Sequence, residues 1–259
     1  MKPQIIFFDI DGTLVSFKTH SIPVSTKSAI YQLREKGIKV VIATGRSFSE
    51  IDNLEDLEFD GYISSNGSCC FDSRGEIIAQ HTLSKESLGR LALYLAERPF
   101  PCTFMTNKGN FMNYVDEQVL LITQLVNIPV PPIKLVSEII KHDIVQLSAF
   151  IDTEQEAALL KDVLTDCCSS RWHSVFVDFN VKHSNKATGM DIFLTHFNIE
   201  REYTMAFGDG GNDISMLKHA AIGIAMNNAS DDVKQAANYV TDSVDDDGVI
   251  NALKCFNIL

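Results

Sequence analysis

The chain has 259 residues, enough for one large or two modest domains with a sizeable core. Hydrophobic residues make up 45% and charged residues 22%, as in ordinary globular proteins, and no apolar run is long enough to span a bilayer. The formal net charge is −12 and no basic patch is apparent, which argues against a nucleic-acid or membrane partner. An anionic substrate would need local cations to offset this overall field.

The six cysteines follow no zinc-binding spacing, and the two adjacent pairs, Cys69-Cys70 and Cys167-Cys168, are poorly placed to bridge each other. The first apolar run resembles no signal peptide, because Asp9 and Asp11 interrupt it. We therefore expect a cytoplasmic protein whose thiols are reduced and mostly fill its core.

The first third of the chain alternates short apolar runs with amphipathic ones. These patterns predict strands at Ile5–Phe8, Lys39–Ala43 and 61–65, and helices at 25–36 and 48–57. A hairpin of residues 69–71 and 76–81 follows. Alternating strands and helices of this kind indicate an α/β fold with a doubly wound parallel, Rossmann-like sheet.

The pattern changes to α+β from residue 83 to residue 184. Helices are predicted at 84–97, 116–126 and 154–164, and strands at Cys102–Thr106, 111–115, 144–151 and 172–179. We interpret residues 83–184 as a second domain inserted into the first.

The α/β alternation then returns and runs to residue 259. Helices are predicted at 188–197, Ile214–His219, 230–237 and 249–256, and strands at 203–207, 221–225 and Tyr239–Val240. Residues 1–82 and 185–259 are therefore expected to form one domain together. The acidic run at 245–247 is interpreted as a solvated loop.

Asp9 and Asp11 are the most informative pair in the chain. Residues two apart in a strand point to the same face, so both carboxylates would arrive together at the end of the first strand. The pair indicates either a cation site or a nucleophile beside an acid/base.

Three further segments follow predicted strands or the inserted block. Thr44-Gly45-Arg46 offers a hydroxyl and a backbone N–H that could hold a phosphate oxygen, and Lys186 stands where the inserted block ends. Residues 208–213 combine glycines with Asp209, Asn212 and Asp213. Since open α/β sheets bind ligands at the carboxyl ends of their strands, we expect these groups to meet there. Clustered oxygen ligands favour Mg²⁺ over zinc.

In these four segments the chain resembles the haloacid dehalogenase superfamily of phosphatases, and most of all its Cof-type branch. The resemblance rests on Asp9-Ile10-Asp11-Gly12-Thr13, on Thr44 and Lys186, and on residues 208–213. It extends along the whole chain, including Asn66-Gly67, and the inserted block is similar to that branch's α+β cap. Ala187 departs from the pattern, since many relatives carry glycine after the lysine.

The resemblance implies a phosphatase of small phosphomonoesters, such as sugar phosphates, that works through an aspartyl-phosphate. Asp9 would be the nucleophile and Asp11 the acid and base. The Asp9 carboxylate, the Asp11 carbonyl and Asp209 would hold Mg²⁺, with Asp213 behind them or bound through water. The phosphate oxygens would be held by Thr44, the Gly45 N–H, Lys186 and Asn212.

Several points stay open at this stage. Arg46 could contact substrate or pair with a carboxylate, and the cap residues that face the substrate are sought among 107–110 and 172–183. A phosphomutase, or a receiver-type phosphoacceptor without turnover, remains an alternative to a phosphatase. The expected partner is a small phosphorylated metabolite, and the protein is expected to be a monomer or a weak homo-oligomer.

Overall fold

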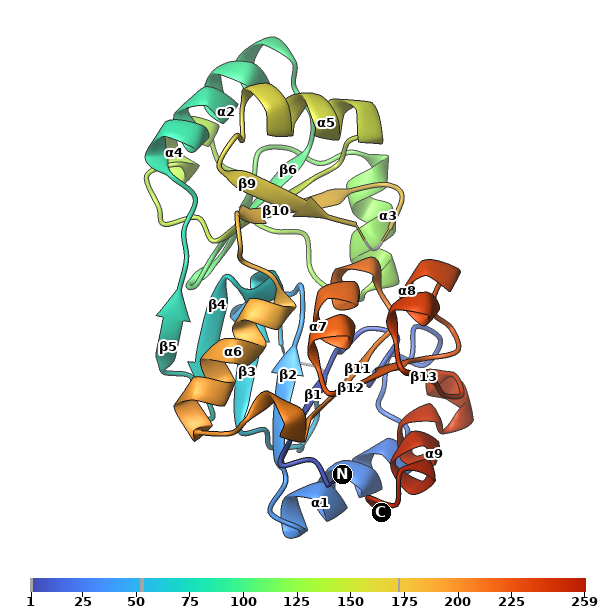
Figure 1. Cartoon of the computed structure of the whole chain (residues 1–259). Coiled ribbons are helices and arrows are strands. Elements are labelled where there is room, and N and C mark those ends of the chain that lie inside the picture. The colour runs from blue at the N-terminus through green and yellow to red at the C-terminus, as the bar shows by residue number, and fades with distance from the viewer. Residues whose placement is uncertain (1, 52–53, 172) are drawn as a thin grey trace.

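The computed structural model describes residues 2–51, 54–171 and 173–259. Within these ranges the chain forms an eight-stranded sheet and a five-stranded sheet, which lie one above the other, each with helices of its own (Figure 1). None of the helices in the described ranges has the length and apolar character needed to cross a membrane.

The eight-stranded sheet has the order β13–β12–β11–β1–β2–β3–β4–β5. Its strands are β1 Ile5–Phe8, β2 Lys39–Ala43, β3 Gly61–Ser64, β4 Cys69–Asp72, β5 Ile77–Gln80, β11 Thr204–Gly208, β12 Ile222–Ala225 and β13 Tyr239–Val240. The strands from β13 to β3 run parallel to one another. The strand β4 pairs antiparallel with both of its neighbours, β3 and β5. The chain winds outward from β1 in both directions, so β1, β2 and β11 lie side by side at the switch point.

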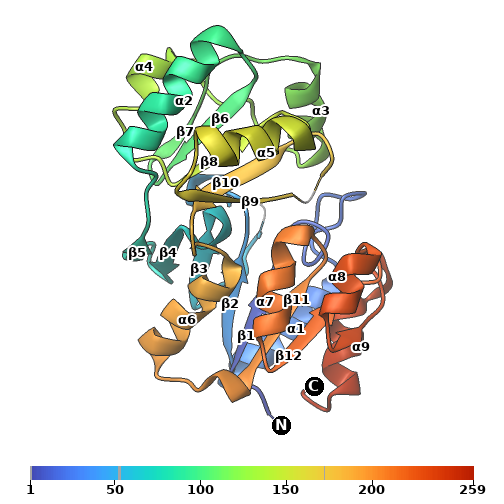
Figure 2. The same ribbon diagram turned by 45° about the horizontal axis from the view of Figure 1, so that its top comes forward.

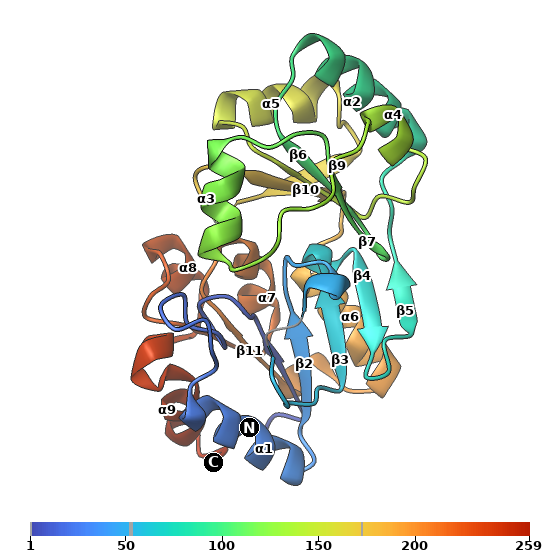
Figure 3. The same ribbon diagram turned by 180° about the vertical axis from the view of Figure 1, so that it is seen from behind.

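Both faces of this sheet are covered by helices because its strands are apolar on both faces. Ile6 and Phe8 pack with α1 Val24–Glu35 and α9 Gly248–Cys255, while Ile5 and Phe7 pack on the other face. That second face is covered by α6 Lys186–Phe197, α7 Ile214–His219 and α8 Asp231–Ala236. In Figure 1 α6 and α7 lie in front of the sheet, and in Figure 3 they lie behind it.

The five-stranded sheet is antiparallel throughout, in the order β7–β6–β8–β10–β9. Its strands are β6 Cys102–Thr106, β7 Gly109–Met112, β8 Gln146–Ala149, β9 Cys167–Ser170 and β10 Val177–Val181. The helices of this part are α2 Lys85–Glu97, α3 Glu117–Leu125, α4 Val136–Ile139 and α5 Thr153–Asp162. Figure 2 shows α2, α4 and α5 on the side away from the eight-stranded sheet.

The two faces of the small sheet differ in chemistry because side chains alternate along each strand. Phe104, Leu147 and Phe179 pack with α2, α4 and α5 in an apolar cluster. The residues between them, Thr103, Ser148 and Asp178 among others, are polar and yet buried. A polar sheet face buried in this way must be covered by partners with hydrogen-bonding groups.

The α/β fold with an inserted α+β block is confirmed, and most predicted elements are found within a few residues. The helix expected at 48–57 is wrong: it is a 3₁₀ turn, Phe48–Glu50, and residues 52–53 lie outside the described residues. The Phe48 ring stacks on Phe71 at 4.1 Å between centroids instead of lining a helix face. Here a tertiary aromatic contact prevails over the helical pattern.

Two differences concern the inserted block. The strand expected at 172–179 begins only at Val177, because the Arg171 guanidinium binds the carbonyl oxygens of Ser174 and Phe176 and holds a turn; Trp172 lies outside the described residues. The strand β9 and the short helix α4 were not predicted. The half-polar sequence of β9, Cys-Cys-Ser-Ser, carries little strand signal.

Gly67 allows the end of β3 to pack against the start of α6. Its φ is +96°, and a Cβ there would lie 2.1 Å from the carbonyl oxygen of Asn185. Gly67→Ala should therefore lower the free energy of unfolding by about 3 kcal/mol or more in urea denaturation.

Gly37 is the matched control, since its φ is +73° but a Cβ would meet nothing within 4 Å. Gly37→Ala should cost only about 1 kcal/mol, the strain of the left-handed backbone alone. Equal losses for the two variants would contradict the close approach to Asn185.

Candidate active site

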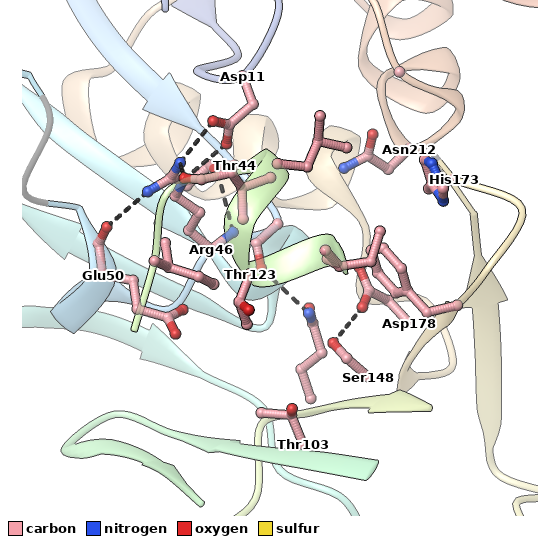
Figure 4. A pocket seen from close by; sticks show the side chains of 18 of the residues that line it. Asp11, Thr44, Arg46, Glu50, Thr103, Thr123, Ser148, His173, Asp178 and Asn212 are labelled. Carbon is pink, nitrogen blue, oxygen red and sulfur yellow. Dashed lines mark hydrogen bonds and ion pairs between the residues drawn. The ribbon is translucent and has the colours of Figure 1, made fainter. Parts of the chain in front are cut away.

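Three neighbouring strands deliver the candidate site to one edge of the large sheet. Asp9 and Asp11 follow β1, Thr44 follows β2 and Asp209 follows β11. With Asn212 they line a cavity of about 460 Å³ between this edge and the small sheet (Figure 4). The switch point of the parallel sheet is where such folds bind ligands.

Lys186 is the first residue of α6 and is fully buried. Its ammonium donates to the carboxylates of Asp9 and Asp213, each at 2.6 Å. Asn185 begins the helix with a capping box, so the lysine backbone is fixed where the chain returns from the small sheet. The contact between Lys186 and Asp9 joins residues 177 positions apart in sequence and gives Asp9 a buried cationic partner.

Asp209 and Asp213 are held by the loop that carries them. One oxygen of Asp213 accepts the backbone N–H groups of Asp209 and Gly210, at 2.9 and 2.8 Å. The Asp209 carboxylate accepts from the Thr13 hydroxyl at 2.9 Å and from the Asn228 amide at 3.1 Å. Both carboxylates are therefore oriented by the chain before any ligand arrives.

Burial and mutual repulsion make it unfavourable for all three carboxylates of the cluster to be ionised. Burial, followed by repulsion from Asp213, raises the pKa of Asp9 well above its usual range, although Lys186 acts in the opposite direction. Burial, then repulsion from Asp213, raises the pKa of Asp209 to about 7. Burial lowers the pKa of Lys186, but Asp213 and Asp9 outweigh it, so the net pKa is raised and the ammonium stays charged.

The cluster fits a hard divalent cation. Carboxylate oxygens of Asp9, Asp209 and Asp213 all lie within 4.8 Å of one another, and the group contains no histidine or cysteine. Oxygen-only donor sets suit hard ions. A second positive charge beside Lys186 would also relieve the repulsion that raises the two aspartate pKa values.

Asp11 is held by Arg46. The guanidinium donates hydrogen bonds to both oxygens of the carboxylate, at 2.8 and 2.7 Å, in a bidentate pair (Figure 4). It also donates to the carbonyl oxygens of Glu50 and Val126, at 3.2 and 2.9 Å. Of the two interpretations left open for Arg46, the structure shows a carboxylate partner, and that partner is Asp11.

Of the residues expected at the phosphate, Thr44, Gly45 and Asn212 border the same cavity, whereas Lys186 is buried behind Asp9. The Thr44 hydroxyl accepts the Arg46 N–H at 3.1 Å, and the Asn212 amide donates to the Asn66 side-chain oxygen at 2.9 Å. A Cβ on Gly45 would lie 3.3 Å from that same Asn66 oxygen, so the glycine keeps this corner open.

Sequence reasoning missed the polar residues of the small sheet and gave Asn66 no role. The Asn66 amide donates to Asp178 at 3.0 Å and to Gln146 at 3.1 Å, and Gln146 donates to the Gly45 carbonyl at 3.2 Å. The amide of Asn180 donates to the Ser65 carbonyl at 2.9 Å. The sequence pattern that could have identified these polar residues is the alternation of apolar and polar residues in Gln146–Ala149 and Val177–Val181.

Of the regions where substrate contacts were sought, only part borders the cavity. His173, Phe176 and Asp178 line it, whereas no residue of 107–110 does. In that hairpin Asn107 instead bonds to Gln80 at 2.7 Å, and Asn110 to Ser47 at 3.0 Å. The expectation for the hairpin is therefore wrong, because its tip is occupied with contacts to the large-sheet part.

Comparison with known proteins gives consistent matches. A family model described as haloacid dehalogenase-like hydrolase matches residues 6–253. The putative phosphatase YkrA of Bacillus subtilis (strain 168) is 32% identical over 262 residues, which cover 100% of both chains.

Solved structures match along the same length. The HAD subclass IIB sugar phosphatase BT4131 is 40% identical with a TM-score of 0.93, covering 99% of this chain and 100% of that one. The phosphatase BT1666 from Bacteroides thetaiotaomicron is 36% identical with a TM-score of 0.91, covering 100% of this chain and 96% of that one. Both sheets therefore have counterparts in these proteins.

The buried pair of Lys186 with Asp9 and Asp213 should be sensitive to loss of its cation. Lys186→Met leaves two carboxylates buried without their partner, and we expect the free energy of unfolding to fall by about 3–5 kcal/mol. Lys39→Met is the control, because Lys39 and Asp60 form a partly exposed pair worth less than about 1 kcal/mol. Similar losses in urea denaturation would contradict the buried geometry.

Asp178 should give stability a distinct pH dependence. Burial raises its pKa to about 6, Lys186 and the hydrogen bonds from Ser148 and Asn66 lower it, and Glu50 raises it. The folded chain thus holds a proton that the unfolded chain has released, so stability falls as pH rises from about 4 to about 6.

Asp178→Asn removes this titration. At each pH the free energy of unfolding of Asp178→Asn is subtracted from that of the wild type. This difference should fall by about 1–3 kcal/mol between pH 4 and pH 7. Asp162→Asn, at an exposed position of α5, is the control and should leave the pH profile of the wild type unchanged. A constant difference between wild type and Asp178→Asn would contradict the raised pKa.

Proposed function

Since the chain belongs to the haloacid dehalogenase-like hydrolase family and is a phosphatase, we propose that it is Mg²⁺-dependent and hydrolyses small phosphomonoesters, such as sugar phosphates, through an aspartyl-phosphate on Asp9. The observation that carries this proposal is the buried Lys186 ammonium at 2.6 Å from Asp9, beside Asp209 and Asp213. A phosphate dianion could not approach these carboxylates without such positive charge.

The Asp9 and Asp209 carboxylates and the backbone carbonyl of Asp11 would hold the Mg²⁺ ion. The Asp213 carboxylate already accepts from Lys186 and from two backbone N–H groups, which favours a supporting role or a water-mediated contact. When bound, the ion would neutralise phosphate charge and orient the phosphoryl group toward Asp9.

Asp9 attacks phosphorus with one carboxylate oxygen, and the bond from phosphorus to the leaving oxygen breaks. Asp11 gives its proton to that leaving alkoxide, which departs as an alcohol. Asp11 then takes a proton from the water that attacks the aspartyl-phosphate, and inorganic phosphate leaves as Asp9 is restored. The bidentate contact with Arg46 holds Asp11 as a carboxylate, so one Asp11 oxygen must leave Arg46 and take up a proton before it can protonate the leaving group.

The oxygens of the transferred phosphoryl group would be held by four donors close to Asp9. These donors are the Thr44 hydroxyl, the Gly45 N–H, the Lys186 ammonium and the Asn212 amide. Asn66 supports the set, because its side-chain oxygen accepts from Asn212 and so fixes the amide orientation. Positioning of this kind supplies much of the catalysis in phosphoryl transfer.

We further propose a division of labour between residues 1–82 with 185–259, which form the catalytic core, and residues 83–184, which form a cap. Each part has apolar clusters of its own, which supports their separation. The polar face of the cap sheet covers the site, and Gln146 and Asn180 bond to core carbonyls. A cap placed here would exclude water and select the leaving group.

Asp9→Asn tests the mechanism most simply. We expect phosphate release from a panel of small phosphomonoesters to fall by at least about 10³-fold, because the amide is no nucleophile. Removal of divalent ions with EDTA should abolish wild-type turnover, and added Mg²⁺ should restore it. The exposed substitution Asp162→Asn is the control and should retain full activity.

Turnover by Asp9→Asn at the wild-type rate would eliminate Asp9 as the nucleophile. Full activity in EDTA would eliminate the metal requirement. Folding of each variant is checked by its urea denaturation curve, so that loss of activity is not confused with loss of structure.

A further inference from the structure

The cavity between core and cap is divided into a polar and an apolar wall. Strand register places Thr103, Ser148 and Asp178 in one row across β6, β8 and β10, on the face toward the core. Phe150 follows the end of β8 and Phe176 precedes the start of β10, each two residues from Ser148 or Asp178, and their ring centroids are 5.6 Å apart. All five residues line the cavity.

The helix α3 extends the apolar wall. Val119 and Ile122 are buried in one cluster with Phe150 and Phe176, and both also border the cavity. In Figure 4 this helix, in green, crosses the centre of the view of the cavity. A leaving group that enters from the phosphate site therefore meets aromatic and aliphatic carbon as well as oxygen atoms on the cavity wall.

Asp178 is a carboxylate that the catalytic scheme does not use. It is 2% exposed, and within the described residues its hydrogen-bond partners are neutral: the Ser148 hydroxyl and the Asn66 amide. Two neutral donors do not compensate a buried negative charge, and a carboxylate can accept further hydrogen bonds. A ligand group that donates to it would supply the missing compensation.

We propose that, among small phosphomonoesters, the cavity favours those whose organic part carries an aromatic ring and, beside it, a hydroxyl or ammonium group over sugar phosphates. The ring packs on Phe150, Phe176 and α3, and the donor binds Asp178. This inference rests on the proposed phosphatase function and adds the class of leaving group. It makes Asp178 a substrate-binding residue that sets specificity.

The test compares substrates that have or lack an aromatic ring and a hydrogen-bond donor, in the wild type and in a variant without the charge at residue 178. The ring-and-donor substrates are O-phosphotyramine and 4-(hydroxymethyl)phenyl phosphate, which separate an ammonium from a hydroxyl. 4-Ethylphenyl phosphate carries a ring alone, and ethanolamine phosphate and hexose 6-phosphate carry donors without an aromatic ring. For each, kcat/KM is measured with wild type and with Asp178→Asn.

We expect kcat/KM of the wild type to be highest for a ring-and-donor substrate. Asp178→Asn should lower that value by about 10- to 100-fold, the loss of a charge-assisted hydrogen bond, and change the value for 4-ethylphenyl phosphate by less than about 3-fold. Retained turnover of 4-ethylphenyl phosphate also shows that the variant is folded.

Two further variants keep the test decisive if Asp178→Asn folds poorly. Ser148→Ala should weaken donor-bearing substrates selectively, since it removes a hydrogen bond that orients Asp178. Val119→Thr, nearly the same in shape, should weaken ring-bearing substrates selectively by placing a hydroxyl in the apolar wall.

Equal losses on all substrates in these variants would overturn the inference and reduce Asp178 to a structural contact between cap and core. Turnover of hexose 6-phosphate or ethanolamine phosphate as efficient as that of the ring-and-donor substrates would overturn it as well. Wild-type inactivity on all of these compounds and on acetyl phosphate would instead overturn the proposed function, and the inference with it.

Discussion

The balance of charge at the edge of the large sheet is the constraint on which the site depends. Asp9, Asp11, Asp209 and Asp213 meet there because β1 and β11 are neighbours. Among the described residues, Lys186 and Arg46 are the cations that form ion pairs with them. Burial, and then repulsion from Asp213, raises the pKa values of Asp9 and Asp209. A site with this excess of negative charge gains stability when a divalent cation arrives, and with that cation it can accept a phosphate.

The small sheet shows how one strand pattern serves two purposes. Alternation along β8 and β10 sends Leu147 and Phe179 into the apolar cluster beneath the helices, and sends Gln146, Ser148 and Asp178 toward the core. Gln146, Ser148 and Asp178 all border the cavity, and Gln146 and Asp178 also bond to Gly45 and Asn66 of the large-sheet part. The hydrogen bonds that join the two parts of the chain and the polar groups that border the cavity therefore lie on the same face of one sheet.

The residues of the candidate site were predictable because each stands directly after an apolar strand or at the return from the insert, and the parallel sheet brings such positions together. The order of the strands, and hence the proximity of Lys186 to Asp9 across 177 positions, needed the structure. Asn66 was noticed only as part of a motif, since its bonds to Asp178 and Asn212 cross between distant segments. The helix expected at 48–57 failed because ring stacking of Phe48 on Phe71 is a long-range contact that no local pattern contains.

The most direct measurement of the central claim is chemical trapping of the covalent intermediate. The protein is quenched during steady-state turnover with Mg²⁺ and a good substrate, reduced with borohydride, digested and analysed by mass spectrometry. An acyl phosphate on Asp9 would be reduced to homoserine, so we predict a mass change in the peptide that contains Phe7, Phe8 and Asp9, and none without substrate. Modification at another aspartate, or none at Asp9 while turnover continues, would contradict the account.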